Sequence, residues 1–210
     1  MIDNNEMICI ALWAIFGFQH SLLARPGTKK IIRKVMGKTF EVNLYPFFYF
    51  VSQCIVFLAI YDVIRHLNTD IIFYQLSETG ESIIYWFNRA ANIFLIITVF
   101  HFDIGKFIGI TQLYNYVRGR KNTQPKFSNT SDINTAFLYK YIRHPMYLGI
   151  LLVYVTSTTI YTNLFLINFF CILFYIEIGS FYEEKSLTRQ FGETYINYKK
   201  NTKKYVPFIR

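Results

Sequence analysis

Residues 146–181 read MYLGILLVYVTSTTIYTNLFLINFFCILFYIEIGSF. This segment holds two apolar runs, and only Tyr161, Thr162 and Asn163 separate them. The bilayer core contains no water to bond with, so a crossing chain must pair its backbone polar groups internally, as an α-helix does. The segment therefore predicts two membrane helices joined in a tight hairpin.

Three further apolar runs precede this hairpin. About 20 apolar residues cross a bilayer as a helix, and the second and third runs meet that length, whereas the fourth is the shortest. The predicted spans are residues 7–24, 44–64, 83–102, 146–160 and 164–181. A membrane β-barrel would need short alternating segments instead. We therefore predict an all-α membrane protein with five transmembrane helices and a single domain, 1–210.

The composition favours a membrane protein over other classes. Of 210 residues, 53% are hydrophobic and only 17% are charged, against about 25% charged residues in soluble domains. An aromatic content of 20% excludes a disordered chain. With 10 Gly and 3 Cys, the chain is neither collagen-like nor a disulfide framework.

The charges are clustered and predict the orientation. Segments 25–41 and 103–143 carry six and seven Lys or Arg residues, and seven more follow residue 181. Segment 62–82 has one Arg against four acidic residues. Because basic loops stay in the cytoplasm, we expect the N-terminus outside and the C-terminus inside, with the tail continuing the fifth span as a helix. Topology thus accounts for the net charge of +9, and no nucleic-acid binding is predicted.

Polar side chains gather at the predicted cytoplasmic ends of four spans. Ionisable groups in a membrane are costly and often mark functional positions. The polar side chains at these four ends are Gln19, His20, His101, Asp103, Arg143, His144, Glu183 and Glu184. The predicted topology places them at one depth and so predicts a site at the cytoplasmic face. The alternative is that the interface simply tolerates them.

The C-terminal third carries an ordered series of motifs. Residues 139–149 read YKYIRHPMYLG, residues 183–187 read EEKSL, and residues 191–198 read FGETYINY. In order and spacing, this series resembles the C-terminal signature of the isoprenylcysteine carboxyl methyltransferase and phospholipid N-methyltransferase group of membrane enzymes. That group transfers methyl groups from S-adenosylmethionine without a Rossmann domain, and the chain indeed lacks a G-x-G-x-x-G motif.

The N-terminal half narrows the resemblance. Residues 16–26 read FGFQHSLLARP and residues 101–104 read HFDI, and both stretches resemble the methanethiol S-methyltransferases. Membrane proteins linked to nitrite and nitric oxide reduction share the first stretch. The resemblance implies methylation of methanethiol to dimethyl sulfide. It also implies a small thiol and the lipid bilayer as partners, a bacterial cytoplasmic membrane and an active site facing the cytoplasm.

The resemblance also implies a cofactor site within residues 139–208. Paired carboxylates accept hydrogen bonds from ammonium or hydroxyl groups, and a guanidinium can pair with the cofactor's carboxylate. The alternative for Arg143 is a positive anchor at the membrane surface. The predicted cofactor-binding residues are Tyr141, Arg143, His144, Pro145, Tyr147, Gly149, Glu183 and Glu184. No metal site is predicted.

Methyl transfer to sulfur needs a thiolate as nucleophile. His20 and His101 are the candidate bases because histidine titrates near neutrality. Asp103 is a third candidate, as base or as a partner that orients a ring. Phe16 and Gln19 are predicted to contact the substrate. Either histidine would alternatively make a structural hydrogen bond.

Two rival functions stay open at this point. The first is the same chemistry on a prenylcysteine carboxylate or a lipid amine. The second is a non-enzymatic membrane protein of nitrite or nitric oxide metabolism. Binding of S-adenosylmethionine separates the second rival from the enzymes, whereas the oligomeric state is left open by the sequence.

Overall fold

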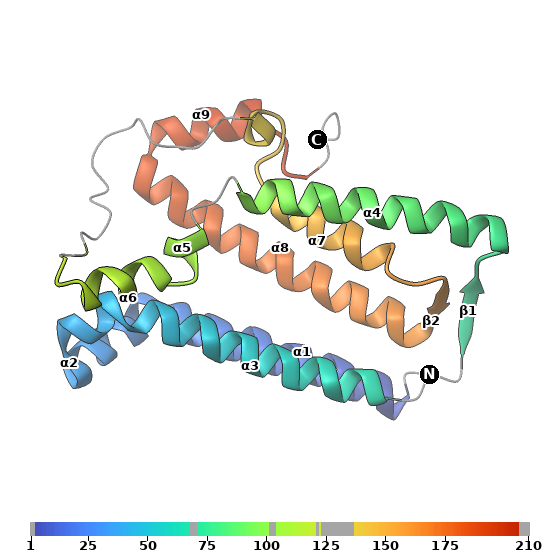
Figure 1. Cartoon of the computed structure of the whole chain (residues 1–210), viewed down its shortest axis with the longest axis horizontal. Coiled ribbons are helices and arrows are strands. Elements are labelled where there is room, and N and C mark those ends of the chain that lie inside the picture. The colour runs from blue at the N-terminus through green and yellow to red at the C-terminus, as the bar shows by residue number, and fades with distance from the viewer. Residues whose placement is uncertain (1–2, 68–70, 101–103, 121, 123–136, 206–210) are drawn as a thin grey trace. The chain divides into compact units, whose positions relative to one another are not determined.

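The computed structural model describes residues 3–67, 71–100, 104–120, 122 and 137–205. Most of them are helical (Figure 1). Four helices are long and apolar enough to cross a membrane: α1 (Asn4–Ala24), α3 (Tyr45–His66), α4 (Glu78–Phe100) and α8 (Asn163–Phe191). The chain divides into two compact units: a first unit of Met1–Thr69 with Phe102–Lys126, and a second unit of Asp70–His101 with Phe127–Arg210.

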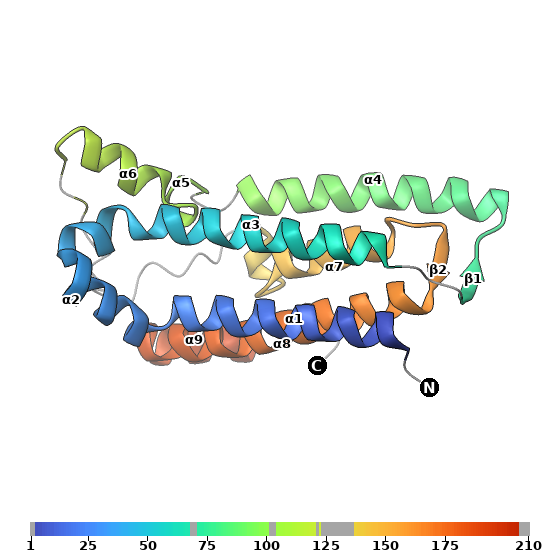
Figure 2. The ribbon, with the colours of Figure 1, turned by 90° about the horizontal axis from the view of Figure 1, so that it is seen from below.

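The first unit is built on the antiparallel pair of α1 and α3 (Figure 2). Asp3 begins α1 with a reciprocal cap: its carboxylate accepts from the Glu6 N–H at 2.7 Å, and its own N–H donates to Glu6 Oε2 at 3.0 Å. In sequence, α2 (Pro26–Asn43) connects α1 to α3, and it is kinked at Gly37. The short helices α5 (Ile104–Phe107) and α6 (Ile110–Val117) complete the unit.

In the second unit, α7 (Pro145–Val155) packs along α4 (Figure 1). A Cβ added to Gly149 would lie 3.1 Å from Leu95 Cδ1, so the absence of a side chain lets the two helices approach. Further along, the Asn88 side-chain amide donates to Val153 O at 3.3 Å and to Thr156 Oγ1 at 3.0 Å. These contacts align α7 with α4 from Gly149 to the end of α7.

Two consecutive helices form as predicted, but the tight turn predicted between them is wrong, because the chain leaves α7 before residue 160. The helix α7 has only 11 residues, and the chain after it forms β2 (Ile160–Thr162), which pairs antiparallel with β1 (Ile72–Gln75). The register places Ile72 opposite Thr162 and Gln75 opposite Ile160. Residues 156–159 read TSTT, and β-branched or hydroxylated residues favour extended backbone and compete with helical hydrogen bonds. The expectation of purely helical structure was therefore wrong for these two short strands.

The last long helix continues beyond its apolar part, as the sequence predicts. The N-cap of α8 is Thr162, whose hydroxyl accepts from the Phe165 N–H at 3.1 Å. The helix ends at Gly192, whose φ of 55° favours glycine, and the chain then forms α9 (Glu193–Asn201). A short 3₁₀ helix, η1 (Phe137–Lys140), lies ahead of α7.

Candidate functional site

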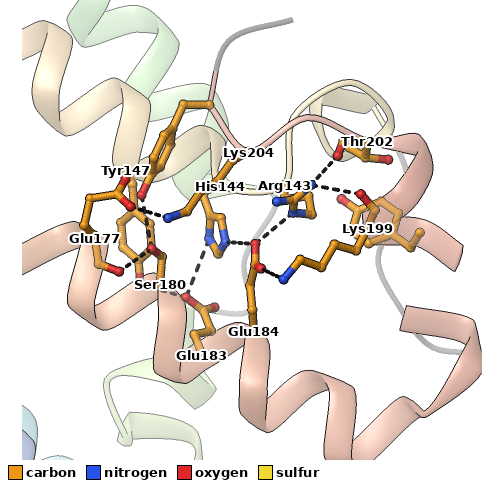
Figure 3. Close-up of polar contacts among 12 residues, drawn as sticks. Arg143, His144, Tyr147, Glu177, Ser180, Glu183, Glu184, Lys199, Thr202 and Lys204 are labelled. Atoms are coloured by element: carbon orange, nitrogen blue, oxygen red, sulfur yellow. Dashed lines mark hydrogen bonds and ion pairs between the residues drawn. The ribbon is translucent and has the colours of Figure 1, made fainter. Parts of the chain in front are cut away.

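The residues at the start of α7 are held beside a segment made of the last residues of α9 and those that follow it. The N–H of Arg143 donates to Lys203 O at 2.7 Å, and the N–H of His144 donates to Lys204 O at 3.1 Å. Residues 199–205, which we call the tail segment, thereby form a parallel bridge to Ile142. This bridge fixes the backbone of Arg143 and His144, and Figure 3 shows their side chains turned toward α8.

Glu184 of α8 is the centre of the charged cluster (Figure 3). Its Oε1 accepts from Arg143 Nε at 2.8 Å and lies 3.2 Å from His144 Nε2, while its Oε2 lies 2.6 Å from Lys199 Nζ. The side chains of Glu184 and Arg143 are only 7% and 10% exposed. A buried charge needs such pairing because it has lost its water. Both carboxylate oxygens of Glu184 thus have charged or polar partners within the protein.

A second nitrogen of the Arg143 guanidinium donates to the tail segment. Nη1 donates to Lys199 O at 3.1 Å and also to Thr202 O. One guanidinium therefore links the beginning of α7, the middle of α8 and the tail segment. The sequence suggested Arg143 as a partner for a cofactor carboxylate, but the structure shows its Nε and Nη1 already bonded within the protein.

Glu183 differs from its neighbour in exposure and in partners. Its side chain is 39% exposed, and its Oε2 accepts from the Tyr147 hydroxyl at 2.8 Å. The same oxygen lies 3.7 Å from His144 Nδ1. The His144 ring stacks on Tyr147 with centroids 5.2 Å apart, and Tyr205 lies 6.0 Å away. Glu183 is thus an accessible carboxylate at the edge of an aromatic group.

A further ion pair joins α8 to the tail segment. Glu177 pairs with Lys204, and the Ser180 hydroxyl lies 2.9 Å from Glu177 O and 3.1 Å from the Tyr205 hydroxyl. Glu177, Ser180 and Glu184 are three and four residues apart, so they share one face of α8. That spacing is visible in the sequence, but it does not show that Lys199, Lys204 and Tyr205 would meet this face.

Two tyrosines of α9, the buried Tyr195 and the half-buried Tyr198, lie next to the cluster. Burial raises the pKa of Tyr198 to about 12 and also raises the pKa of Tyr195. The Tyr198 hydroxyl donates to Tyr139 O at 2.6 Å, which ties α9 to the chain ahead of α7.

The structure brings together most, but not all, of the predicted cofactor residues. Arg143, His144, Tyr147, Glu183 and Glu184 meet in the cluster, with Pro145 buried in the first turn of α7 beside them. Tyr141 lies outside the cluster and is 60% exposed. Gly149 faces Leu95 in the packing of α7 on α4.

The predicted acceptor residues belong to the first unit. The ring of Phe16 on α1 lies 5.9 Å from the ring of His20 and 6.1 Å from that of Phe57 on α3. The His20 ring lies 5.7 Å from Tyr49. We call this aromatic contact between the two helices the α1–α3 seam. Next to His20, the Oε1 atom of Gln19 is buried, and no described residue forms a hydrogen bond with it. The other two candidates, His101 and Asp103, lie outside the described residues.

Comparison with known families and proteins gives a consistent result. The sequence profile of the phospholipid methyltransferase family matches residues 89–194. This range includes the beginning of α7 and both glutamates of the cluster, whereas Lys199 and Lys204 follow it.

Curated relatives extend the similarity over nearly the whole chain. The methanethiol S-methyltransferase of Crocosphaera subtropica is 31% identical over 209 residues, which cover 97% of this chain and 75% of that protein. The methanethiol S-methyltransferase of Pseudomonas deceptionensis is 27% identical over 208 residues, covering 97% and 73%. No solved structure matches the chain significantly.

Proposed function

The chain belongs to the phospholipid methyltransferase family, and from this premise we propose that it methylates methanethiol to dimethyl sulfide with S-adenosylmethionine as methyl donor. It is a membrane methyltransferase by family and by its four apolar helices. The choice of a small thiol as acceptor is supported by the names of its relatives. One observation supports a methyl-donor site in the second unit. Arg143, His144 and Glu184 form a charged cluster there, and Arg143 also bonds to the tail segment.

The groups of the cluster fit S-adenosylmethionine chemically. Glu183 is a half-exposed carboxylate that can accept from an amino group or from ribose hydroxyls. The rings of His144, Tyr147 and Tyr205 suit a sulfonium cation, which is attracted to aromatic faces. When bound, S-adenosylmethionine supplies an electrophilic methyl group.

The residues of the cluster then have distinct tasks. Tyr147 donates to Glu183 and thereby fixes the orientation of that carboxylate. Glu184 holds Arg143 and His144, and Arg143 holds the tail segment. We assign Glu183, Tyr147 and His144 to binding of the methyl donor. Arg143, Glu184 and the buried Pro145 position them.

For the acceptor, we propose His20 as the base that takes the thiol proton, since only the thiolate is strongly nucleophilic. Phe16 supplies an apolar contact beside the His20 ring, and Gln19 is a polar contact. His101 and Asp103 remain proposals that rest on the sequence alone.

We also propose how the enzyme lies in the membrane. It is a single membrane domain, 1–210, that crosses the bilayer five times, with the N-terminus outside and the C-terminus in the cytoplasm. The methyl-donor site then faces the cytoplasm of a bacterial cell, where S-adenosylmethionine is made. The distribution of Lys and Arg supports this orientation.

The test is methyl transfer by purified protein in detergent. S-adenosylmethionine and methanethiol are supplied, and dimethyl sulfide is measured in the headspace. We expect product from wild type and a loss of about 10²-fold or more for His20→Ala. Glu183→Gln should weaken S-adenosylmethionine binding, with Glu193→Gln, an exposed residue at the start of α9, as the matched control.

The rival functions give different results in the same experiment when phosphatidylethanolamine is supplied as well. A lipid amine acceptor, favoured by the description of the family, predicts methylated phosphatidylethanolamine and no dimethyl sulfide. A non-enzymatic role in nitrite or nitric oxide metabolism predicts neither product and no S-adenosylmethionine binding. Either pattern would refute the thiol acceptor.

A further inference from the structure

Gln53 lies on the α1–α3 seam, between the two places where α3 touches the aromatic residues of α1. Tyr49, Gln53 and Phe57 are four residues apart and so lie on the same face of α3. Tyr49 contacts His20, and Phe57 contacts Phe16. Gln53 is therefore level with the stretch of α1 between Phe16 and His20, and it is only 9% exposed.

The hydrogen bonds around Gln53 fix the orientation of its amide. The Ser52 hydroxyl donates its single proton to Tyr49 O at 2.7 Å. Towards Gln53 this hydroxyl can therefore only accept, and it does so from Nε2 at 3.3 Å. The other end of the amide, Oε1, must therefore be an acceptor.

This acceptor is buried without a hydrogen-bond partner among the residues that the structure describes. Such a group is costly, and a polar residue within a membrane span often marks a substrate site. An apolar residue of the same size would fill the position without that cost. Together with the aromatic rings of the α1–α3 seam on the same face of α3, this unpaired oxygen indicates a ligand that brings one donor hydrogen and an apolar body.

We propose that Gln53 binds the methyl acceptor, with its Oε1 accepting the S–H hydrogen of the neutral thiol. This assignment rests on the proposed function. The aromatic rings of Phe16 and Phe57 flank the position and suit the methyl group of methanethiol. A carbonyl oxygen attracts the thiol but repels the thiolate. Gln53 therefore assists binding of the neutral thiol, and the S–H hydrogen leaves Oε1 when His20 takes the proton before methyl transfer.

The experiment compares Gln53→Met with Gln112→Met in the full-length protein. Gln112 on α6 is a matched control because its Oε1 is likewise buried without a described partner, and its Nε2 donates to Lys106 O at 3.0 Å. We expect Gln53→Met to raise the KM for methanethiol about 3- to 10-fold, the effect of one lost hydrogen bond. The kcat, the KM for S-adenosylmethionine and the thermal midpoint should change little. Gln112→Met should leave the KM for methanethiol unchanged.

The alternative outcomes overturn the proposal in distinguishable ways. An active wild type with an unchanged KM in Gln53→Met shows that the oxygen serves only packing or a water molecule, and the proposed function survives. A rise of both KM values with a lower thermal midpoint assigns Gln53 a structural role. A wild type that makes no dimethyl sulfide refutes the proposed function and this assignment with it.

Discussion

Glu183 and Glu184 are adjacent in sequence, yet the structure gives them opposite environments. Successive residues on a helix point about 100° apart, so one carboxylate faces the tail segment and the other the aromatic group. Glu184 is 7% exposed and lies against Arg143, His144 and Lys199. Glu183 is 39% exposed and bonded by Tyr147. We therefore expect Glu184 to control the stability of the protein and Glu183 to control binding of the methyl donor.

Glu184→Gln should strongly destabilise the protein. The change leaves Arg143 buried without a carboxylate, and breaking a buried pair costs about 3 kcal/mol. For a chain of this length, that corresponds to a fall of about 6–12 °C in the thermal midpoint. Circular dichroism in detergent measures it. Glu183→Gln is the control and should shift the midpoint by less than about 3 °C. Equal shifts in the two variants would contradict the distinction.

The sequence predicted the central residues of this cluster but not the contacts that the tail segment makes with them. Arg143, His144 and the paired glutamates stand in recognisable motifs. Lys199 and Lys204 lie in a run of similar lysines, and their partners on α8 come from another part of the chain. The bond from Arg143 to Thr202 joins residues 59 positions apart. Pairing over such a distance depends on tertiary structure and has no local signal.

At the scale of elements, the contact of α7 with α4 depends on one glycine. Gly149→Ala would place a Cβ 3.1–3.2 Å from Leu95, including its backbone Cα, so the helices must move apart. Overpacking of this kind costs about 1–3 kcal/mol. We expect a lower thermal midpoint for Gly149→Ala, again measured by circular dichroism.

Gly179→Ala on α8 is the matched control for that change. A Cβ there has nothing within 4 Å, and alanine is favoured over glycine inside a helix by about 0.5–1 kcal/mol. Its midpoint should therefore rise slightly. If both variants raised the midpoint, the close approach of α7 and α4 at Gly149 would be refuted.

The long helices were predictable because apolar runs are local signals. The predicted spans agree with α1, α3, α4 and α8 apart from several residues at their ends. The two strands were not predictable in the same way, because β1 lies in a segment without clear alternation, and its partner β2 follows some 85 residues later. A two-stranded pairing so distant in sequence depends on the packing of α4 against α7.

At the scale of the whole molecule, the pairing of β1 with β2 bears on the number of membrane crossings. The strand β1 precedes α4, and β2 follows α7. Two hydrogen-bonded strands lie on the same side of a membrane, so if α4 crosses the bilayer, the chain must return before β2. Gly149 lies level with Leu95, and Thr156 lies level with Asn88. Segment 149–156 therefore runs alongside residues 88–95 of α4, and β2 then lies beside the strand that precedes α4. These contacts support the proposal of a fifth crossing, made by α7 and the extended residues after it.

Cysteine labelling tests this topology directly. With five crossings, Thr79→Cys in the first turn of α4 and Ser157→Cys after α7 should both react with a membrane-impermeant thiol reagent on intact cells, because both positions are exposed and lie outside. Lys200→Cys on α9 should react only after permeabilisation. Wild type is the control, since Cys9, Cys54 and Cys171 lie within the apolar helices. If only the four long helices crossed, Ser157→Cys would be shielded in intact cells and Lys200→Cys would be labelled. That pattern would also contradict the pairing of β1 with β2, because it places the two strands on opposite sides of the membrane.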